Sequence, residues 1–226
     1  SDFNILGYGF SAKATVLSTF FFDANSFSKT SKVGAYLIKA DACDNIFIQG
    51  MTAKDLQTEN NFIDIICAVI DTQVILANSD FENIFQTSTQ GKWLAVNFIS
   101  IGTQNFSNTS LGEIIIENNT FKNITLSRDE GYTKETAQTG FLSIFMTQSA
   151  TNMINNSFYL INMTDGNIMA ISSPTLMIQE ANYSSVYFGD SKGGLSLIFQ
   201  RLTLKDSTFE NSASSNYIGA GLIKLT

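Results

Sequence analysis

Short apolar runs alternate with polar corners along the chain, and residues 114–124 show this pattern most fully. Three isoleucines are followed there by Glu117 and two asparagines, and then by Phe121 and Ile124. Across the chain, apolar residues recur at alternate positions of such runs, which is the period of a β-strand. The runs are too short between turn signals to form long helices. The pattern predicts short strands separated by tight polar corners.

The pattern recurs at intervals, which indicates an internal repeat. Aligning the units on their aromatic residue gives spacings of 26, 28, 40, 37, 25 and 26 residues. A second marker, a four-residue apolar segment, begins at intervals of 27 residues. The aligned positions are Phe27, Ala53, Phe81, Phe121, Phe158, Tyr183 and Phe209, and the second segments begin at Phe141, Ile168, Leu195 and Leu222. Two markers with a similar period predict stacked coils of three short strands each.

Position within the unit predicts which side chains face the core. Residues five and seven before the aromatic are apolar except for Thr151, and we expect them to point inward. Polar corner residues stand two before and two after the aromatic, where Asn and Ser tolerate left-handed backbone and bond to nearby main chain. Stacked along an axis, they can hydrogen-bond from coil to coil. They are Asn25, Ser79, Asn119, Asn156 and Ser207 before the aromatic, with Met51 and Ala181 as exceptions, and Asp55, Asn83, Asn123 and Asn211 after it.

One position that should face outward is mostly apolar. It lies six residues before the aromatic and reads Phe21, Phe47, Ile75, Ile115, Asn152, Met177 and Thr203. An outward strip that faces water should be polar, and a contiguous apolar strip usually has a cover. A terminal helix or loop outside this segment is an alternative cover, but we expect this face, through Phe21, Phe47, Ile75, Ile115 and Met177, to pack against a partner protein or another copy of the chain.

Segments such as 117–123 and 206–211 resemble coils of the right-handed parallel β-helices of the pectin-lyase-like superfamily. Residues 209–213 and 219–223 are similar to the Phe/Asn and Gly-Gly-Ala repeats of non-enzymatic surface proteins. Examples are the polymorphic outer membrane proteins of bacteria and the large pectin-lyase-fold surface proteins of ciliates. The resemblance implies an all-β solenoid, a right-handed parallel β-helix of about seven coils over residues 1–226. A leucine-rich repeat is the alternative, because residues 114–124 also fit its consensus.

Composition narrows the classes of partner. The chain has 226 residues, of which 44% are apolar, and a net charge of −7 with few basic residues. Such a balance argues against binding to nucleic acid or to anionic membrane surfaces. No apolar run reaches the roughly 20 residues needed to cross a bilayer. The chain starts without Met and ends inside what reads as a new repeat, so we expect it to be a segment of a longer protein.

Two longer insertions and two cysteines interrupt the repeat. The insertions, near 102–110 and 127–139, are expected to be outer loops, which in solenoids often form the binding face. Bare surface loops without a partner are the competing interpretation. Cys43 and Cys67 either pair across adjacent coils or are ordinary buried thiols. The sequence leaves both possibilities open.

Residues for catalysis are scarce. The chain has no His, which removes the usual Ser-His and Cys-His dyads and the common zinc ligand sets. Asp41, Asp44, Asp64 and Asp71 could bind Ca²⁺ through oxygen ligands, although solvated corner carboxylates are the simpler interpretation. We therefore predict no catalytic residue, no cofactor and no metal site.

Glycosylation signals are more numerous. Seven asparagines open an Asn-x-Ser/Thr sequon, and an occupied sequon would place the chain in a secretory pathway. They are Asn105, Asn108, Asn118, Asn123, Asn155, Asn162 and Asn182. Asn118 and Asn155 fall at tight corners and could instead point inward, whereas Asn105, Asn108 and Asn162 are the better candidates.

The sequence thus predicts a non-enzymatic scaffold, structural or adhesive, at the cell surface or outside the cell. It would assemble with copies of itself or with partner proteins. A carbohydrate-binding or carbohydrate-active β-helix is the alternative function, with the long loops and acidic corners as its site.

Overall fold

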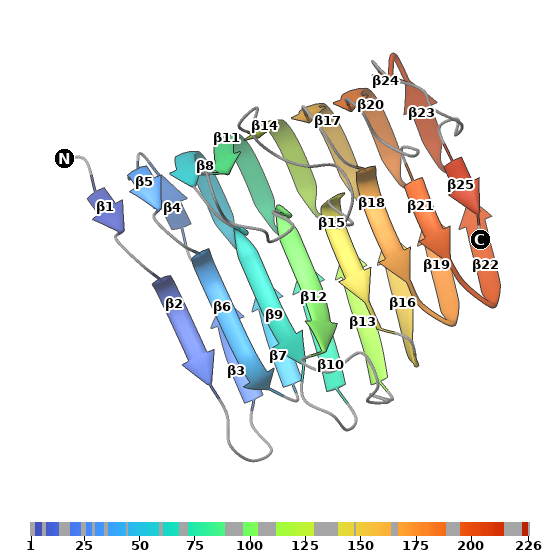
Figure 1. Cartoon of the computed structure of the whole chain (residues 1–226), viewed down its shortest axis with the longest axis horizontal. Coiled ribbons are helices and arrows are strands. Elements are labelled where there is room, and N and C mark those ends of the chain that lie inside the picture. Colours follow the sequence, from blue (N-terminus) through green and yellow to red (C-terminus); the bar gives the residue numbers. More distant parts are fainter. Residues whose placement is uncertain are drawn as a thin grey trace.

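The chain folds as a parallel β-helix, in which three parallel sheets run along one axis (Figure 1). The computed structural model describes residues 3–5, 8–13, 19–23, 26–28, 30–33, 36–43, 45–58, 61–67, 72–88, 97–103, 112–128, 140–146, 148–163, 167–188, 195–214 and 223–225. Every regular element in these residues is a β-strand. The predicted all-β solenoid is confirmed. Three sheets of parallel strands, with no helix in the described part, exclude the leucine-rich alternative there.

Each coil passes from sheet C to sheet A and then to sheet B. Sheet C contains β3 (Thr19–Asp23), β7 (Asn45–Gln49), β10 (Thr72–Ala77), β13 (Gly112–Glu117), β16 (Ser149–Ile154), β19 (Thr175–Gln179) and β22 (Arg201–Lys205). Sheet A contains β1 (Phe3–Ile5), β4 (Ser26–Ser28), β5 (Thr30–Val33), β8 (Thr52–Thr58), β11 (Asp80–Ser88), β14 (Thr120–Arg128), β17 (Ser157–Met163), β20 (Asn182–Phe188), β23 (Thr208–Glu210) and β24 (Ala213–Ser214). Sheet B contains β2 (Tyr8–Lys13), β6 (Tyr36–Cys43), β9 (Ile63–Cys67), β12 (Ile99–Thr103), β15 (Gly140–Phe145), β18 (Asn167–Ser172), β21 (Leu195–Ile198) and β25 (Ile223–Leu225).

The register of sheet A confirms the alignment on the aromatic residue. Successive strands pair Phe27 with Ala53, Ala53 with Phe81, and so on through Phe209 without a slip. The second marker is only partly right. Leu142 pairs with Met169, but Met169 pairs with Leu195, which the 27-residue spacing had aligned with Ile168. Leu195 and Leu197 are buried whereas Ile198 is exposed. The register between β18 and β21 therefore follows the buried side chains, not the first apolar residue of each segment.

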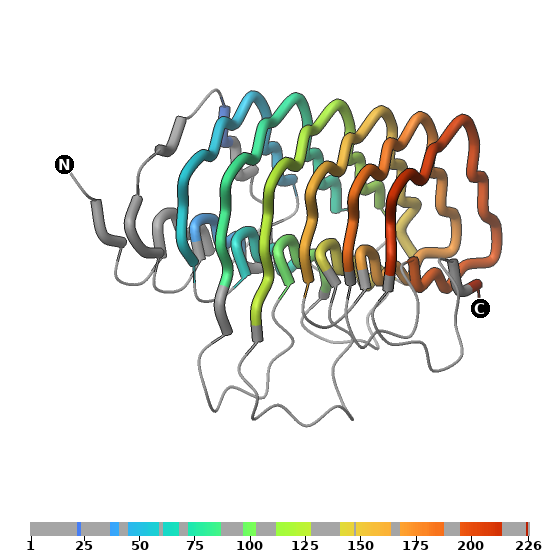
Figure 2. The backbone as a smooth tube through the Cα atoms, turned by 90° about the horizontal axis from the view of Figure 1, so that it is seen from above, coloured from blue at the N-terminus to red at the C-terminus, as the bar shows by residue number. Residues whose placement is uncertain are grey.

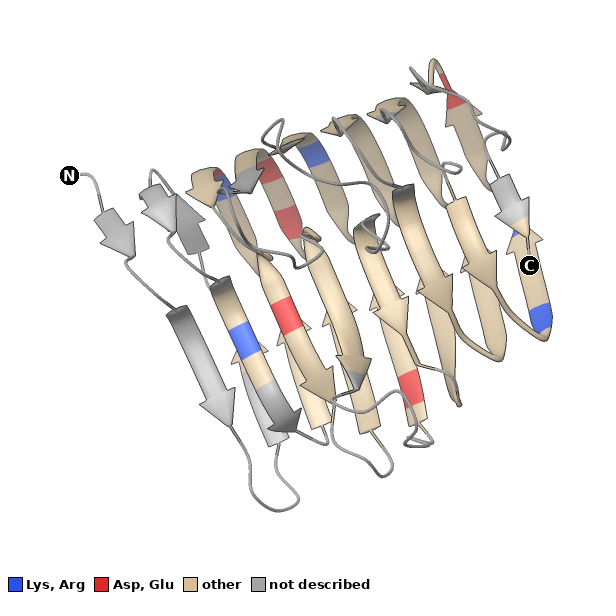
Figure 3. Ribbon diagram, viewed as in Figure 1, with Lys and Arg blue, Asp and Glu red and all other residues tan. Residues whose placement is uncertain are grey.

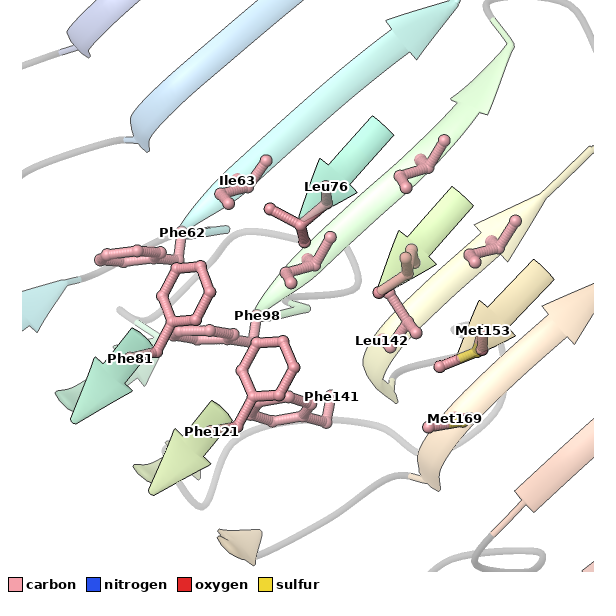
Figure 4. Close-up of a cluster of buried hydrophobic side chains, with 14 of the residues drawn as sticks. Phe62, Ile63, Leu76, Phe81, Phe98, Phe121, Phe141, Leu142, Met153 and Met169 are labelled. Atoms are coloured by element: carbon pink, nitrogen blue, oxygen red, sulfur yellow. The ribbon is translucent and has the colours of Figure 1, made fainter. Parts of the chain in front are cut away.

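Two aromatic ladders fill the core between sheets A and B (Figure 4). In the first, Phe81, Phe121 and Phe158 stack with ring centroids 4.9 and 5.0 Å apart. In the second, Phe62, Phe98 and Phe141 stack at 4.8 Å. Rings of one ladder meet rings of the other edge to face, at centroid separations from 5.3 Å to 6.3 Å. In this geometry the quadrupoles of the aromatic rings attract one another, which stabilises the core beyond the burial of apolar area.

Tight bends recur at the same place in each coil, and the tube in Figure 2 shows them nested from coil to coil. One column of left-handed residues lies three before the aromatic and consists of Gly50, Asn78, Asn118, Asn155, Glu180 and Asp206. A second column lies two after it and consists of Asp55, Asn83, Asn123, Leu160, Ser185 and Asn211. The predicted left-handed backbone is therefore confirmed for the corner after the aromatic. For the corner before it, the left-handed residue is one position earlier than predicted.

The residue two before the aromatic is buried and polar in three successive coils, whereas the buried residues Met51 and Ala181 fill the same position elsewhere. Ser79, Asn119 and Asn156 are at most 1% exposed. Ser79 N donates to Asn119 Oδ1 at 3.0 Å, and Asn119 Nδ2 donates to Asn156 Oδ1 at 3.0 Å. The predicted coil-to-coil bonding is confirmed for these residues, which satisfy main-chain groups that the bend would otherwise leave buried without partners.

The two predicted insertion loops lie mostly outside the described residues. Residues 102–103 belong to β12 and 127–128 to β14, so the loops begin later than predicted. Residues 104–110 and 129–139 are not among those the structure describes.

Candidate interaction surfaces

The outer face of sheet C carries the predicted apolar column, here called the sheet C strip. Its members pair in unbroken register from Phe21 through Phe47, Ile75, Ile115, Asn152 and Met177 to Thr203. The residues on either side of Ile115, namely Ile114 and Ile116, are fully buried, whereas Ile115 is partly exposed. The inward and outward assignments are therefore correct for β7, β10, β13, β16 and β19, whereas in the last strand, β22, Leu204 was assigned inward and is 41% exposed. The side chain of Phe21 lies outside the described residues.

Polar side chains border the sheet C strip. Asn152, within the strip, donates from Nδ2 to Glu113 Oε1 at 2.7 Å. The next column toward the corner pairs in register through Gln49, Ala77, Glu117, Ile154, Gln179 and Lys205, so four of these six residues are polar and Ala77 is buried. Few charged residues lie on the described strands (Figure 3). An apolar strip with a mostly polar border resembles the composition of protein-binding patches.

A second apolar group lies on the outer face of sheet A and was missed by the sequence analysis. Phe85, Tyr159, Leu160 and Tyr187 are between 40% and 45% exposed. Phe85 pairs with Thr125, and Tyr187 pairs with Asn162, so aromatic and polar side chains share one column. The sequence carries no single repeat position for this group, because Phe85 and Tyr187 lie four residues after the aromatic whereas Tyr159 and Leu160 lie one and two after it. We call these four residues the sheet A cluster.

Charges on sheet A form a cross-coil triad. Glu82 lies between Lys54 and Lys122, with N–O distances of 3.1 and 2.7 Å. Hydrogen bonds from Lys122 and then Lys54 lower the pKa of Glu82, and the bond to Glu82 raises the pKa of Lys122. The three side chains are at least a quarter exposed, so solvent screens the triad and its contribution to stability is small.

Two sequons lie on a left-handed corner and face solvent. Asn118 and Asn155 have φ of 54° and 52° and are exposed. Asn155 Nδ2 donates to Asn118 Oδ1 at 2.8 Å. The suggestion that they point inward is wrong, because the next residues, Asn119 and Asn156, occupy the buried position.

Three further sequons lie on the outer face of sheet A. Asn123 is held in a ladder, since its Nδ2 donates to Asn83 Oδ1 at 2.8 Å. Asn182 accepts a bond from Thr208 Oγ1 at 3.0 Å. Asn162 is exposed in the same column as Tyr187. Asn105 and Asn108 are outside the described residues.

Asp64 was predicted to be a corner carboxylate, but it does not lie at a corner between strands. This residue lies within β9, is 8% exposed, and accepts a bond from Asn61 Nδ2 at 3.1 Å. Asp41 lies in β6, opposite Ile66, and Asp44 and Asp71 fall outside the described residues. Within the described residues, no group of three or more His, Cys, Asp or Glu side chains is placed to hold a metal ion.

Comparison with known proteins returned no family model, curated protein or solved structure that matches the chain. Among the described residues, no helix has the length and apolar character to span a bilayer.

Proposed function

We propose that this chain is part of a non-enzymatic extracellular scaffold, structural or adhesive, that assembles through the outer face of sheet C. The observation that carries the proposal is the sheet C strip, whose members pair in register along the solenoid and whose described apolar side chains are partly exposed. A sheet face that contacts only water favours polar side chains. The cover would be another copy of the chain or a partner protein.

A rigid, regular stack suits such a role. The aromatic ladders and the buried Asn119–Asn156 contact tie each coil to the next. Binding to a preformed sheet face costs little backbone ordering. Several coils therefore present one continuous surface, on which weak contacts add up.

A lysine substitution in the strip tests the proposal. Ile115→Lys places a charge at its centre, whereas Asn152→Lys is the matched control on the adjacent coil, at a position that is already polar. Sedimentation velocity measures self-assembly, and a photo-crosslinking residue at position 115 reports a partner on the native cell surface. We expect Ile115→Lys to abolish association and Asn152→Lys to retain most of it. Equal behaviour of the two variants, or no association of the unmodified chain by either measurement, would count against the proposal.

Carbohydrate binding is the second candidate, and the sheet A cluster favours it. Exposed aromatic rings stack on the apolar faces of sugars, and nearby Asn and Thr side chains offer hydrogen bonds. Tyr187 and Asn162 are register neighbours on adjacent strands. Calorimetric titration with a panel of oligosaccharides tests this reading. Saturable binding that Tyr187→Ala removes and Ile115→Lys leaves intact would establish it, and absence of binding across the panel would reject it.

Localisation and glycosylation belong to the same proposal. Asn162 is the sequon that we expect to carry a glycan, because its side chain is exposed on an outer strand. Asn118 and Asn155 lie on adjacent coils and are bonded to each other, so two glycans there would crowd. Glycopeptide mass spectrometry of the protein from its native source tests this ranking. Sequons that are all bare would argue against a eukaryotic secretory route.

A further inference from the structure

The chain contains two cysteines, and the fold places them opposite each other. Cys43 closes β6 and Cys67 closes β9, and the two are register partners in sheet B. They are 24 residues apart in sequence, which is close to one coil. Alignment on the aromatic residue, which lies in sheet A, does not reveal this pairing, because the cysteines lie at the C-terminal ends of two strands of sheet B.

A shift in register between β6 and β9 creates the match. From Ile38 opposite Ile63 to Asp41 opposite Ile66, the two strands advance residue for residue. The register then shifts, and Cys43 rather than Ala42 stands opposite Cys67. An extra residue of this kind re-aims the chain at the end of a strand. Without it, Cys67 would face an alanine.

The backbone separation suits a covalent bond. Neighbouring parallel strands are about 4.8 Å apart, and disulfide-bonded residues have Cα atoms about 4.4–6.8 Å apart. Cys67 is 3% exposed, at the edge of the core. We propose that Cys43 and Cys67 form a disulfide that joins β6 to β9 when the chain folds under oxidising conditions.

The chemistry is thiol–disulfide exchange with a small disulfide such as oxidised glutathione. The thiolate of one cysteine attacks the oxidant and releases one thiol as a mixed disulfide forms. The second cysteine then attacks the mixed disulfide, forms the Cys43–Cys67 bond and releases the second thiol. The two cysteines lose two protons and two electrons, and the oxidant gains them. Because Cys67 is buried in the folded chain, the exchange takes place before the coil has closed.

The bond would stabilise the N-terminal coils by restricting the unfolded chain. Closing a loop of this length should raise the melting temperature by about 5–10 °C in a protein of this size. Disulfides persist in oxidising compartments, so formation of the bond in the organism rests on the proposed extracellular location. Formation in a test tube does not depend on it.

Refolding in a glutathione redox buffer tests the inference on the full chain. After denaturation without reductant, iodoacetamide should add to neither cysteine, and the mass should be lower than that of the reduced chain by about 2 Da, the two hydrogens lost on oxidation. A peptide map should link Cys43 to Cys67. Reduction should lower the melting temperature of this protein but not that of Cys43→Ala, the control that retains Cys67.

Alkylation of both cysteines under strongly oxidising glutathione ratios would overturn the inference, as would disulfides that link two chains. The location is tested separately on protein from its native source. A bond that forms in the buffer but is missing from the native protein supports the inference about the pair and counts against the extracellular proposal.

Discussion

Asn118 and Asn119 are adjacent and chemically identical, yet the fold uses them differently. Asn118 is exposed with a left-handed backbone, and its side chain bonds only at the surface, to Asn155. Asn119 is 1% exposed and bonds to three groups from two neighbouring coils. The exposed position selects Asn because Asn tolerates left-handed backbone, whereas the buried position selects it because an amide both donates and accepts. Backbone conformation therefore accounts for the asparagine at position 118, and hydrogen bonding accounts for the asparagine at position 119.

The comparison also separates buried asparagines from those that open a sequon. Asn119 and Asn156 are buried and open no sequon. Asn118 and Asn155 open sequons and are exposed. Position within the corner therefore decides which asparagine is accessible.

The largest effect is expected from Asn119→Ala. The change removes the acceptor for Ser79 N and the donor to Leu76 O, and leaves both buried groups without their side-chain partner. We expect the free energy of unfolding to fall by about 3–5 kcal/mol. Urea denaturation followed by circular dichroism measures this change. A loss no greater than that of Asn118→Ala would contradict the distinction between the two sites.

Asn118→Ala should cost less, about 1 kcal/mol, because alanine at a φ of 54° is strained but no buried group is exposed. Asn118→Gly relieves the strain and should change stability by less than about 0.5 kcal/mol. The same denaturation series compares the two variants. If glycine is as destabilising as alanine, hydrogen bonding rather than backbone conformation dominates at this position.

Thr151 is a buried polar residue whose replacement should have the opposite effect to the replacement of Asn119. Its hydroxyl is buried and has no hydrogen-bond partner among the described residues, in contrast to the amide of Asn119. Replacement by valine keeps the shape and removes the unsatisfied group, so Thr151→Val should stabilise the protein by about 1 kcal/mol. Thr151→Ser is the control, since it keeps the hydroxyl and loses a methyl group. A destabilised valine variant would show that the hydroxyl has a partner after all.

Leu160 occupies the left-handed column that Asn123 shares, and has a φ of 53°. Such a conformation is costly for a bulky residue. Leu160→Asn should therefore raise the free energy of unfolding by about 0.5–1 kcal/mol. Leu160→Ala, which removes the side chain but keeps the strain, should not raise it. Because Leu160 belongs to the sheet A cluster, a variant that is more stable but has lost sugar binding would mean that the strain serves function.

The smallest effect should come from the exposed triad. Lys122 and Lys54 hold the pKa of Glu82 below its ordinary value of 4.5. The favourable interaction is therefore fully present above that value and is lost as the pH falls through the lower, folded pKa. Melting curves between about pH 6 and pH 3 should show a slightly shallower pH dependence for Glu82→Gln than for the unmodified protein. Added salt should reduce the difference, and a difference that grows with salt would contradict the assignment.

Much of the fold could be read from the sequence because the repeat is local. The alignment on Phe121 and its equivalents, and the inward positions of Ile114 and Ile116, follow from the two-residue period of a strand. The ladder of Phe62 and Phe98 could not be read this way, since uneven insertions separate its members. Of the candidate surfaces, the sheet C strip was predicted and the sheet A cluster was not.

The sequence by itself determined the strands, their stacking order and the apolar column on sheet C, because alternation within one strand fixes which side chains face inward. The tertiary structure decided what happens where alternation fails. Phe121 and Ile124 both face the core although they are three residues apart, because left-handed Asn123 lies between them. A register shift likewise brings Cys43 opposite Cys67. A bend or a register shift changes which of the following side chains face inward. The hydrogen bonds between coils determine where in the chain these bends and shifts occur.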